Sequence, residues 1–478
     1  MWVSKFCPWI IELPLFEIDN TELKDYDENL YKINKLIEEN WTEIETMMEK
    51  KLLENKWVTN LVKWPKWYSL LVRFKVLYLK SNYNMTYRET EENIKQNIAF
   101  RLFLWVIKSK EITPSYVVVK QWSDEFWEEF IREINEKIIL KRLKTKKVIR
   151  WNRSRWDTTV IEENIAYPTD STLMKKWKEL LVRWIKKLDK IIGNGKSYVD
   201  NGIKKWVRAF RKNYFDIKKY AKKRTDKAKE ELKKSYTNMI EILEETVKNG
   251  QKTLAKIKRE TKQVDEKLKE QIKKEINKTE EYLEKVIKVI EQTRERVINW
   301  KTVEMCKKVI SYFSDKATII MKWKEWKSVE IWRKLAVVEV EKWVVWYWWV
   351  LDWNPKDSKI LRQELEWLEK AIWKKVKNNS RDRWYYDKTD KAAIEEEMWI
   401  KLHIPKVWKK NEEEIALEKK AIFKKYQRFR AGWEWKISLL KRKYWLRRLR
   451  VRGDNSVKNI TWWAIVSENM RILVKNAY

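Results

Sequence analysis

This chain contains very little glycine, histidine or cysteine. It has 6 glycines in 478 residues, whereas glycine makes up about 7% of an average protein. Its single histidine, His403, leaves almost no material for histidine-based zinc sites or catalytic triads. Its two cysteines, Cys7 and Cys306, are too few for a disulfide framework, so we expect a protein of a reducing cytoplasm.

The chain also lacks a hydrophobic run long enough to cross a membrane. Its most apolar window, Leu335 to Trp353, is interrupted by Glu339, Glu341 and Lys342. The alternation in this window favours paired strands over a bilayer helix, and we see no signal peptide. We therefore expect a soluble protein with no membrane partner.

What the chain has in excess is positive charge. It contains 107 lysines and arginines against 71 acids, a formal net charge of +36. Such an excess indicates a polyanionic partner, and nucleic acid is the first candidate. The alternative is that lysines only cover helix surfaces, and for the Lys/Glu-alternating middle of the chain this is the better account.

Three acids stand in distinctive sequence blocks. A β-branched run from Arg155 to Glu162 carries Asp157 and is followed by a proline-containing turn, which predicts a buried strand that presents one carboxylate. Asp382 lies in the block 380–386 and Glu434 in the block 428–438. An isolated acid is most often a solvated surface charge, so the interest of these three depends on the order and wording of their blocks.

The three blocks resemble those of the DDE transposases of bacterial insertion sequences. The first reads Asp-Thr-Thr-Val-Ile-Glu and continues to Tyr-Pro-Thr-Asp-Ser; the second, Asp-Arg-Trp-Tyr, is similar to the family's Asp-Arg-Gly-Tyr. The third, Arg-Ala-Gly-Trp-Glu-Trp-Lys-Ile-Ser, is similar to Arg-x-Gly-x-Glu-Gly-x-Ile-Ser. The resemblance covers about Tyr68 to Leu473 and is densest after Val297.

The resemblance implies an RNase H-like α/β (α+β) fold with a mixed sheet, in which Asp157, Asp382 and Glu434 form a catalytic triad that binds two magnesium ions. Arg430 and Lys441 match the family's arginine and lysine around the glutamate and would hold phosphates beside the cut. The alternative for these two is a basic helix face on nonspecific phosphate. The family's tyrosine has no counterpart at its expected place, since Tyr426 stands one position early.

A transposase of this kind would act on double-stranded DNA, at the terminal inverted repeats of its element and at target DNA, as a homodimer in the nucleoid of the bacterial cytoplasm. The implied organisation is a helical N-terminal DNA-binding domain at 1–145, the first strand of the catalytic domain at 146–171, a helical hairpin insertion at 172–300 and the remaining catalytic domain at 301–478. A catalytically inactive DNA-binding relic of a transposase and a basic helical nucleic-acid-binding scaffold stay open as alternatives; a sheet between 328 and 404 would argue against the scaffold.

Local patterns predict the elements that carry these residues. They are a helix capped by Thr86 and Glu89, a helix over 173–192, helices on either side of a turn at Asn249–Gly250, a hairpin of strands at 328–338 and 343–352, a helix over 359–376, a short strand before Asp382, a helix over 389–397, a strand over 400–404 and a helical tract from 412 onward. On a single helix, Arg430, Glu434 and Lys441 would share roughly one face, because they are spaced four and seven residues apart.

The 33 tryptophans of the chain are as unusual as the missing glycines. Together with the 6 glycines they would restore about the average glycine content. Trp353, Trp384 and Trp435 also stand where the resembling transposases have glycine. Our hypothesis is that UGA codons, read as glycine in some bacterial lineages, are written here as tryptophan; the alternative is a tryptophan-rich protein that stacks on nucleic acid bases.

Overall fold

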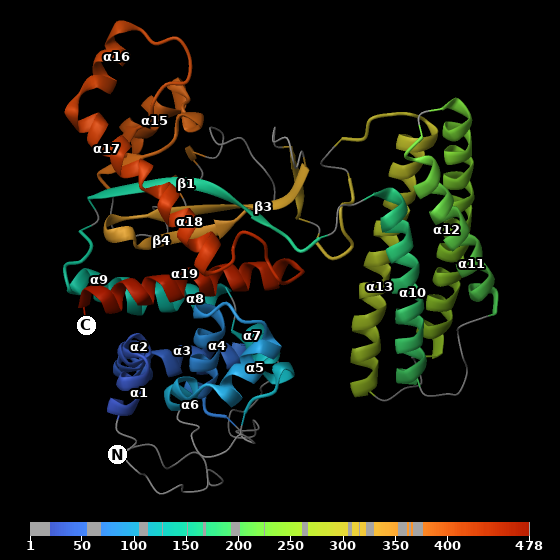
Figure 1. Cartoon of the computed structure of the whole chain (residues 1–478), viewed down its shortest axis with the longest axis horizontal. Coiled ribbons are helices and arrows are strands. Elements are labelled where there is room, and N and C mark those ends of the chain that lie inside the picture. Colours follow the sequence, from blue (N-terminus) through green and yellow to red (C-terminus); the bar gives the residue numbers. More distant parts are fainter. Residues whose placement is uncertain are drawn as a thin grey trace, which may run out of the picture. The chain divides into compact units, whose positions relative to one another are not determined.

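The computed structural model has two compact units (Figure 1). Unit 1 comprises Met1–Asn164 and Trp332–Tyr478, and unit 2 comprises Ile165–Ile331. Unit 2 is thus one uninterrupted segment inserted into unit 1. The residues that the structure describes are 20–54, 68–104, 113–126, 128–150, 152–165, 169–192, 201–223, 225–260, 266–304, 308–314, 316–321, 329–351, 361–362, 365–366 and 376–477.

Helices form the N-terminal part of unit 1. They are α1 (Asn20–Tyr26), α2 (Glu28–Glu39), α3 (Trp41–Glu54), α4 (Leu70–Asn82), α5 (Tyr87–Gln96), α6 (Ile98–Leu104), α7 (Tyr116–Glu125), α8 (Glu128–Glu133), the π-helical η3 (Ile134–Leu140) and α9 (Lys141–Thr145). The predicted cap of α5 is confirmed. The Thr86 hydroxyl accepts the Glu89 N–H at 3.2 Å, and the Glu89 carboxylate accepts the Thr86 N–H at 2.7 Å, which satisfies two N–H groups that a helix start leaves free.

A mixed sheet is formed mostly by residues of unit 1. Its strands are β1 (Arg153–Glu162), β3 (Val329–Glu339), β4 (Val345–Val350), β5 (Asn378–Ser380) and β6 (Lys401–His403), and β2 (Thr318–Met321) also belongs to the sheet. The order is β2-β3-β1-β5-β6, with β4 paired to β3. β1 is antiparallel to β3 and parallel to β5, β3 and β4 form an antiparallel pair, and β5 and β6 are parallel.

The predicted α/β class is therefore confirmed, with a helical N-terminal region and a helical insertion after the first strand. The predicted hairpin, the short strand before Asp382 and the strand over 400–404 are all present. The helix α15 (Lys388–Met398) matches the helix predicted over 389–397. The helix predicted over 359–376 lies largely outside the described residues.

In Figure 1, α18 (Trp433–Lys443) crosses the strands, α17 (Ala421–Ala431) leads into it, and α19 (Asp454–Ala477) runs alongside β4. The Ser380 hydroxyl at the end of β5 donates to the Tyr426 carbonyl in α17 at 3.0 Å. Trp348 in β4 lies against Trp462 in α19, with ring centroids 4.5 Å apart. The shorter α16 (Glu412–Lys419) precedes α17.

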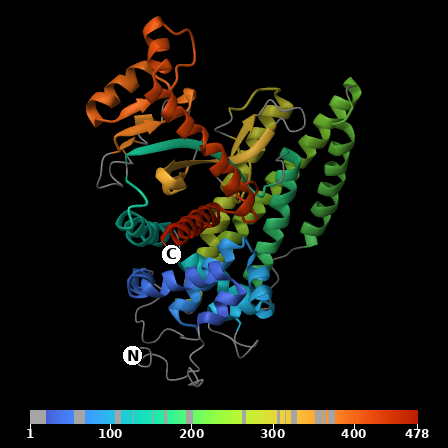
Figure 2. The same cartoon turned by 60° about the vertical axis from the view of Figure 1, so that its left-hand side comes forward.

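Unit 2 is built from four long helices that Figure 2 shows from a second direction. They are α10 (Asp170–Ile192), α11 (Asn201–Tyr220), α12 (Asp226–Glu260) and α13 (Glu266–Thr293), and α13 continues into the π-helical η5 (Arg294–Ile298). α11 packs against α12, and α10 against α13. Apolar side chains at helical spacing, such as Met239, Leu243 and Val247 on α12, form its core.

One expectation about unit 2 is wrong. We predicted a turn at Asn249–Gly250, but α12 runs through both residues and ends ten residues later at Glu260. A glycine inside a helix costs only about 1 kcal/mol. The apolar spacing resumes at Leu254 and Ile257, which are both buried, and this burial outweighs the cost. None of the helices in the described part of the chain is long and apolar enough to span a membrane.

Candidate active site

The central strand β1 carries Asp157, and the neighbouring strand β5 leads to Asp382. β1 and β5 run in the same direction, with Arg155 opposite Ser380. Asp157 follows Arg155 by two residues, and Asp382 follows Ser380 by two residues. The parallel register therefore brings the two acids close together. Successive residues of a strand point to opposite faces, and both acids lie on the face that α17 covers.

An arginine joins the two acids. Nη2 of Arg430, in the last turn of α17, lies 3.2 Å from Oδ2 of Asp157 and 3.5 Å from Oδ2 of Asp382. The Asp157 side chain is only 17% exposed, and its carboxylate also accepts the backbone N–H of Thr158 at 2.8 Å. Two carboxylates from two strands thus converge on one cationic group.

The surroundings of Asp157 change its acidity. Burial raises the pKa of Asp157 from its ordinary value of 3.8 to about 6, and the nearby charge of Asp382 adds to the rise. The Arg430 guanidinium and the Thr158 N–H oppose this shift but do not cancel it. A carboxyl whose ionisation is penalised in this way is stabilised by a cation placed beside it, and perturbed carboxyls of this kind concentrate at functional sites.

The other two predicted residues do not join this pair. Glu434 is exposed in the first turn of α18, and Lys441 lies in the last turn, with its Nζ 5.7 Å from the Trp332 ring centroid on β3. Within the described ranges, no three Asp, Glu, His or Cys side chains gather closely enough to hold a metal ion. The structure therefore assembles Asp157, Asp382 and Arg430 and leaves Glu434 and Lys441 beside them on the next helix.

The tract that carries these residues is divided at Gly432. We expected one helix with Arg430 and Glu434 on a common face, but α17 ends at Ala431 and α18 begins at Trp433. A Cβ atom at Gly432 would lie 2.5 Å from Nη1 of Arg155 and 2.9 Å from the Trp343 ring. Because these neighbours belong to other elements, the helical spacing of the tract could not reveal the division.

Sequence reasoning also missed a buried ion pair beside the acids. Arg155 and Glu339 face each other across β1 and β3 and are both buried. Arg155 Nη2 lies 2.6 Å from Glu339 Oε1, and Nε lies 3.0 Å from Oε2. Both strand-like runs carry several charged residues, so nothing in the sequence singled out Arg155 and Glu339 as a pair.

The described tryptophans include several in backbone conformations that suit glycine. In the described part of the chain, the residues other than glycine with positive φ are Asn84, Lys147, Trp300, Lys342, Trp343, Trp399 and Trp445. Four of these seven are tryptophans, and Trp399 ends α15 at φ 56° and ψ 33°, a helix-terminal position at which glycine is strongly preferred. Trp384 and Trp435 lie in helical turns, so neither needs the freedom of glycine, and Trp353 lies outside the described residues.

Buried indole groups also favour the hypothesis that some of the tryptophan positions are occupied by glycine in the working protein. Several described tryptophans have a buried indole N–H without a hydrogen-bond acceptor: Trp156, Trp177, Trp184, Trp348, Trp433, Trp462 and Trp463. Leaving a buried donor unpaired costs about 1–3 kcal/mol. Natural cores seldom carry so many such groups.

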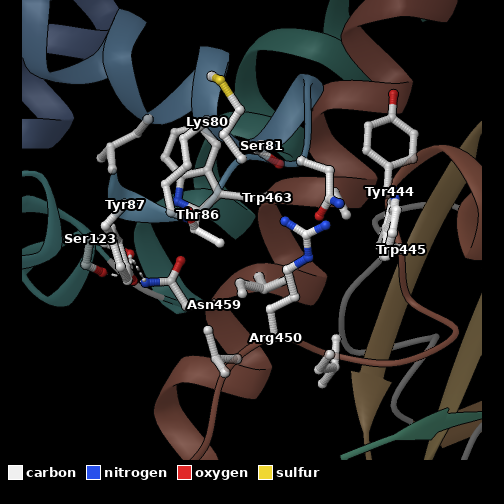
Figure 3. Close-up of a pocket in the computed structure, with 17 residues that line it drawn as sticks. Lys80, Ser81, Thr86, Tyr87, Ser123, Tyr444, Trp445, Arg450, Asn459 and Trp463 are labelled. Atoms are coloured by element: carbon white, nitrogen blue, oxygen red, sulfur yellow. Dashed lines mark hydrogen bonds between the residues drawn. The ribbon is translucent and has the colours of Figure 1, made fainter. Parts of the chain in front are cut away.

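A cavity of about 160 Å³ lies elsewhere in unit 1, between α4 and α5 and the segment 444–464 (Figure 3). It contains none of the predicted site residues. Around it, Nη1 of Arg450 lies 3.1 Å from both carboxylate oxygens of Glu89, and the Asn459 amide donates to the Ser123 hydroxyl at 3.2 Å. These bonds attach the N-terminal helices to the C-terminal segment within one unit.

A family model described as Transposase domain (DUF772) matches residues 19–125 of this chain. The match covers the helical region from α1 to α7 and ends before the sheet. No curated protein and no solved structure matches the chain. The family match supports a transposase function and agrees with the resemblance seen in the sequence blocks.

Proposed function

We propose that this protein is a DDE transposase of an insertion sequence, which cuts DNA at the ends of the element and joins them to target DNA by metal-dependent phosphoryl transfer. The observation that carries the proposal is the convergence of Asp157 and Asp382 on Arg430. These acids come from the two blocks whose wording resembles the transposase family. The strand order β4-β3-β1-β5-β6, with an antiparallel hairpin and two parallel strands, supports an RNase H-like fold for the catalytic domain.

The donors at the site fit magnesium in type. Asp157 and Asp382 offer carboxylate oxygens, the ligands that magnesium prefers, and they already share a cationic neighbour. We assign Glu434 as the third carboxylate, because it follows Arg430 at the spacing of the family block. Two bound magnesium ions would activate the attacking water or 3′ hydroxyl and stabilise the leaving oxygen.

The protein's own residues would orient the DNA strand around this chemistry. Arg430 would hold a phosphate oxygen next to the scissile bond, with its guanidinium kept in place by Asp157 and Asp382. Lys441, in the last turn of α18, would bind a neighbouring phosphate as a point charge. The net charge of +36 would bind the rest of the duplex through its backbone.

This assignment implies double-stranded DNA as the partner, at the terminal inverted repeats and at the target. A homodimer on DNA would treat both ends alike, and the nucleoid of the bacterial cytoplasm would be the place of action. The described sheet argues against the alternative of a purely helical scaffold. The intact pair of acids favours an active enzyme over the alternative of an inactive DNA-binding relic.

The test replaces each acid and follows cutting and binding separately. Asp157→Ala, Asp382→Ala and Glu434→Ala should each abolish magnesium-dependent cleavage of DNA that carries the element's inverted repeats. Affinity for the same DNA should be retained, because binding depends on basic residues. Glu413→Ala, which removes an exposed acid from α16, is the matched control and should cut normally. Cleavage by the Asp157→Ala protein would disprove the mechanism, and binding without cleavage by the unaltered chain would identify a relic.

We also propose that glycine occupies many tryptophan positions of the working protein, because UGA encodes glycine in its host. The left-handed backbone at Trp300, Trp343, Trp399 and Trp445 supports this reading, since such backbone strains any residue other than glycine. Peptide mass spectrometry on protein from the native host tests it. A glycine mass at positions 384 and 399 is expected, and tryptophan masses there would disprove the idea.

A further inference from the structure

A single buried side chain, Arg155 on β1, contacts β3, the end of α17 and Gly432 beside the candidate active site. It lies on β1 two residues before Asp157 and therefore on the same face of the sheet. Its guanidinium makes a two-pronged contact with Glu339 on β3. Planar paired contacts of this kind fix orientation as well as distance, so the guanidinium cannot rotate freely.

The same guanidinium holds the end of α17. Its Nη1 donates a hydrogen bond to the main-chain carbonyl of Phe429, the residue immediately before Arg430. The Phe429 ring lies over it, with its centroid 4.7 Å from the Arg155 Cζ atom. The carbonyls in the last turn of a helix have no partner within the helix, and here one of them accepts from a side chain of the central strand.

Arg155 also lies against the start of the next helix. Gly432, between α17 and α18, faces Nη1 of Arg155 so closely that a Cβ atom there would be 2.5 Å away. Real Cβ atoms do not approach other atoms so closely, so the glycine allows the junction to lie directly on the guanidinium. Arg430 and Glu434 stand two residues before and two residues after this junction.

We propose that Arg155 is a positioning residue: it fixes the α17–α18 junction on β1 and thereby sets the places of Arg430 and Glu434 relative to Asp157. It does so without touching the DNA itself, since it is buried and all its charge-assisted contacts are within the protein. This inference rests on the proposed function. It adds that the geometry of the site depends on Arg155 and on the absence of a side chain at Gly432.

Two variants disturb the junction in different ways. Arg155→Lys keeps the positive charge but loses the planar fork that reaches Glu339 and the Phe429 carbonyl together. Gly432→Ala leaves every charge in place and adds one methyl group against the guanidinium. For each variant, the cleavage rate at saturating DNA should fall roughly 100-fold, because displacement of a catalytic group by about 1 Å has that effect. The dissociation constant for DNA should be unchanged.

The matched control is Arg333→Lys. Arg333 is another fully buried arginine on β3, paired with Asp454 at the start of α19, six residues before Glu339. Its replacement should lower the melting temperature as much as Arg155→Lys does, while the cleavage rate per folded molecule stays at the value of the unaltered protein. This control separates positioning from general loss of stability.

The cleavage rate of a double variant at Arg155 and Gly432 provides a second test, which a general loss of stability would not affect in the same way. A Cβ atom at Gly432 would meet both the guanidinium and, at 2.9 Å, the Trp343 ring. Arg155→Lys relieves only the first of these contacts, so Arg155→Lys combined with Gly432→Ala should lose less cleavage rate than the product of the two single losses. Independent sites would instead multiply their effects. Multiplied effects, or an equal rate loss in Arg333→Lys, would overturn the inference.

The outcome also distinguishes this inference from the proposed function. Normal cleavage by both junction variants, together with an inactive Asp157→Ala protein, would refute the role of Arg155 and leave the transposase assignment standing. Continued cleavage by Asp157→Ala would refute the assignment, and the role of Arg155 in it. Folding of each variant is checked by circular dichroism before the rates are compared.

Discussion

The two units of the molecule differ in how deeply their described ion pairs are buried. In unit 1, Lys436 and Glu468 form an ion pair with both side chains 0% exposed, and Arg155 is buried with Glu339. In unit 2, typical pairs such as Lys258–Glu280 are exposed, at 49% and 43% for the two side chains. Removing charges from water is costly, so a fold that buries them around one sheet face is using them for geometry, whereas the pairs of unit 2 mainly keep helix surfaces solvated.

Unit 2 also contains one described buried acid, Asp170, and it too fixes the arrangement of separate elements. Asp170, at the start of α10, accepts from Gln292 at 2.9 Å and from Arg296 at 2.8 Å. It connects α10 with the end of α13 and the η5 turn. Even here a buried charge marks a place where elements distant in sequence are held in a fixed arrangement.

The largest effect is expected from breaking the buried pair on α18. Lys436→Met leaves Glu468 buried, with Arg471 and the Tyr444 hydroxyl as its remaining partners. The free energy of unfolding should fall by about 3 kcal/mol, the lower end for such a loss, because Arg471 still neutralises the carboxylate. Urea denaturation at pH 7 measures it. The double variant Lys436→Met with Glu468→Leu should recover part of the loss. No recovery would show that the loss of stability comes from altered packing and not from an unpaired buried charge.

A gain of stability is expected from removing the charge of Asp157. Burial raises its pKa from 3.8 to about 6; between these values the unfolded chain ionises this carboxyl while the folded chain keeps it protonated. Its contribution to stability is therefore greatest below pH 4 and is lost as the pH rises through 6. Asp157→Asn should be more stable than the unaltered protein at pH 7.5, by on the order of 2 kcal/mol, and the gain should vanish at pH 4.

Thermal unfolding in metal-free buffer across this pH range tests the prediction. The matched control is Glu468→Gln, because Glu468 shifts the other way. Burial opposes its ionisation, but hydrogen bonds from Arg471 and the charge of Lys436 outweigh burial and lower its pKa to about 2. Glu468→Gln should accordingly lose stability at pH 7.5. A gain in both variants would contradict the opposite electrostatic roles assigned to these acids.

A smaller gain is expected at the end of α15. Trp399 is 81% exposed and has a left-handed backbone, so Trp399→Gly removes strain without removing buried contacts and should raise the free energy of unfolding by about 1 kcal/mol. Trp408, which is 79% exposed and does not have positive φ, provides the comparison. Trp408→Gly should give no gain, and equal gains at both positions would show that exposure of the indole, not the backbone, is responsible.

The smallest effect is expected in unit 2. Lys258→Ala removes one partner of an exposed pair between α12 and α13 and should change the free energy of unfolding by less than about 1 kcal/mol. Asp170→Ala, which removes the buried acid of the same unit, should cost more. If Lys258→Ala cost as much as Lys436→Met, the contrast between the two units would be wrong.

Local patterns predicted the elements whose causes are local. The β-branched run around Asp157 is a strand, Thr86 and Glu89 cap a helix, and the alternating segments after residue 328 form a hairpin. The closeness of Asp157 and Asp382 follows from the parallel register of β1 and β5. The sequence blocks identified both acids as site residues. Their approach to Arg430 could not be predicted in the same way, because it depends on which strands pair.

The features that were missed depend on neighbours distant in the sequence. The glycine at Gly250 is tolerated because α12 is held by other helices, while the glycine at Gly432 lies between α17 and α18, where Arg155 and Trp343 leave no room for a side chain. Both are single glycines in helical surroundings, and no local pattern separates them. The pairing of Arg155 with Glu339 across two strands was equally invisible.

The insertion of unit 2 between β1 and β3 has a consequence for how the chain is made. Trp156 pairs with Val338, so the first strand leaves the ribosome before any of its sheet partners exist, and the whole helical unit is synthesised in between. At roughly 5–20 residues per second, this leaves β1 without a partner for on the order of ten seconds. The helices of unit 2 make mainly local contacts and can fold within that time. The strand edges of β1 meanwhile remain open to other chains, which makes newly synthesised protein, rather than the finished molecule, the form most exposed to aggregation.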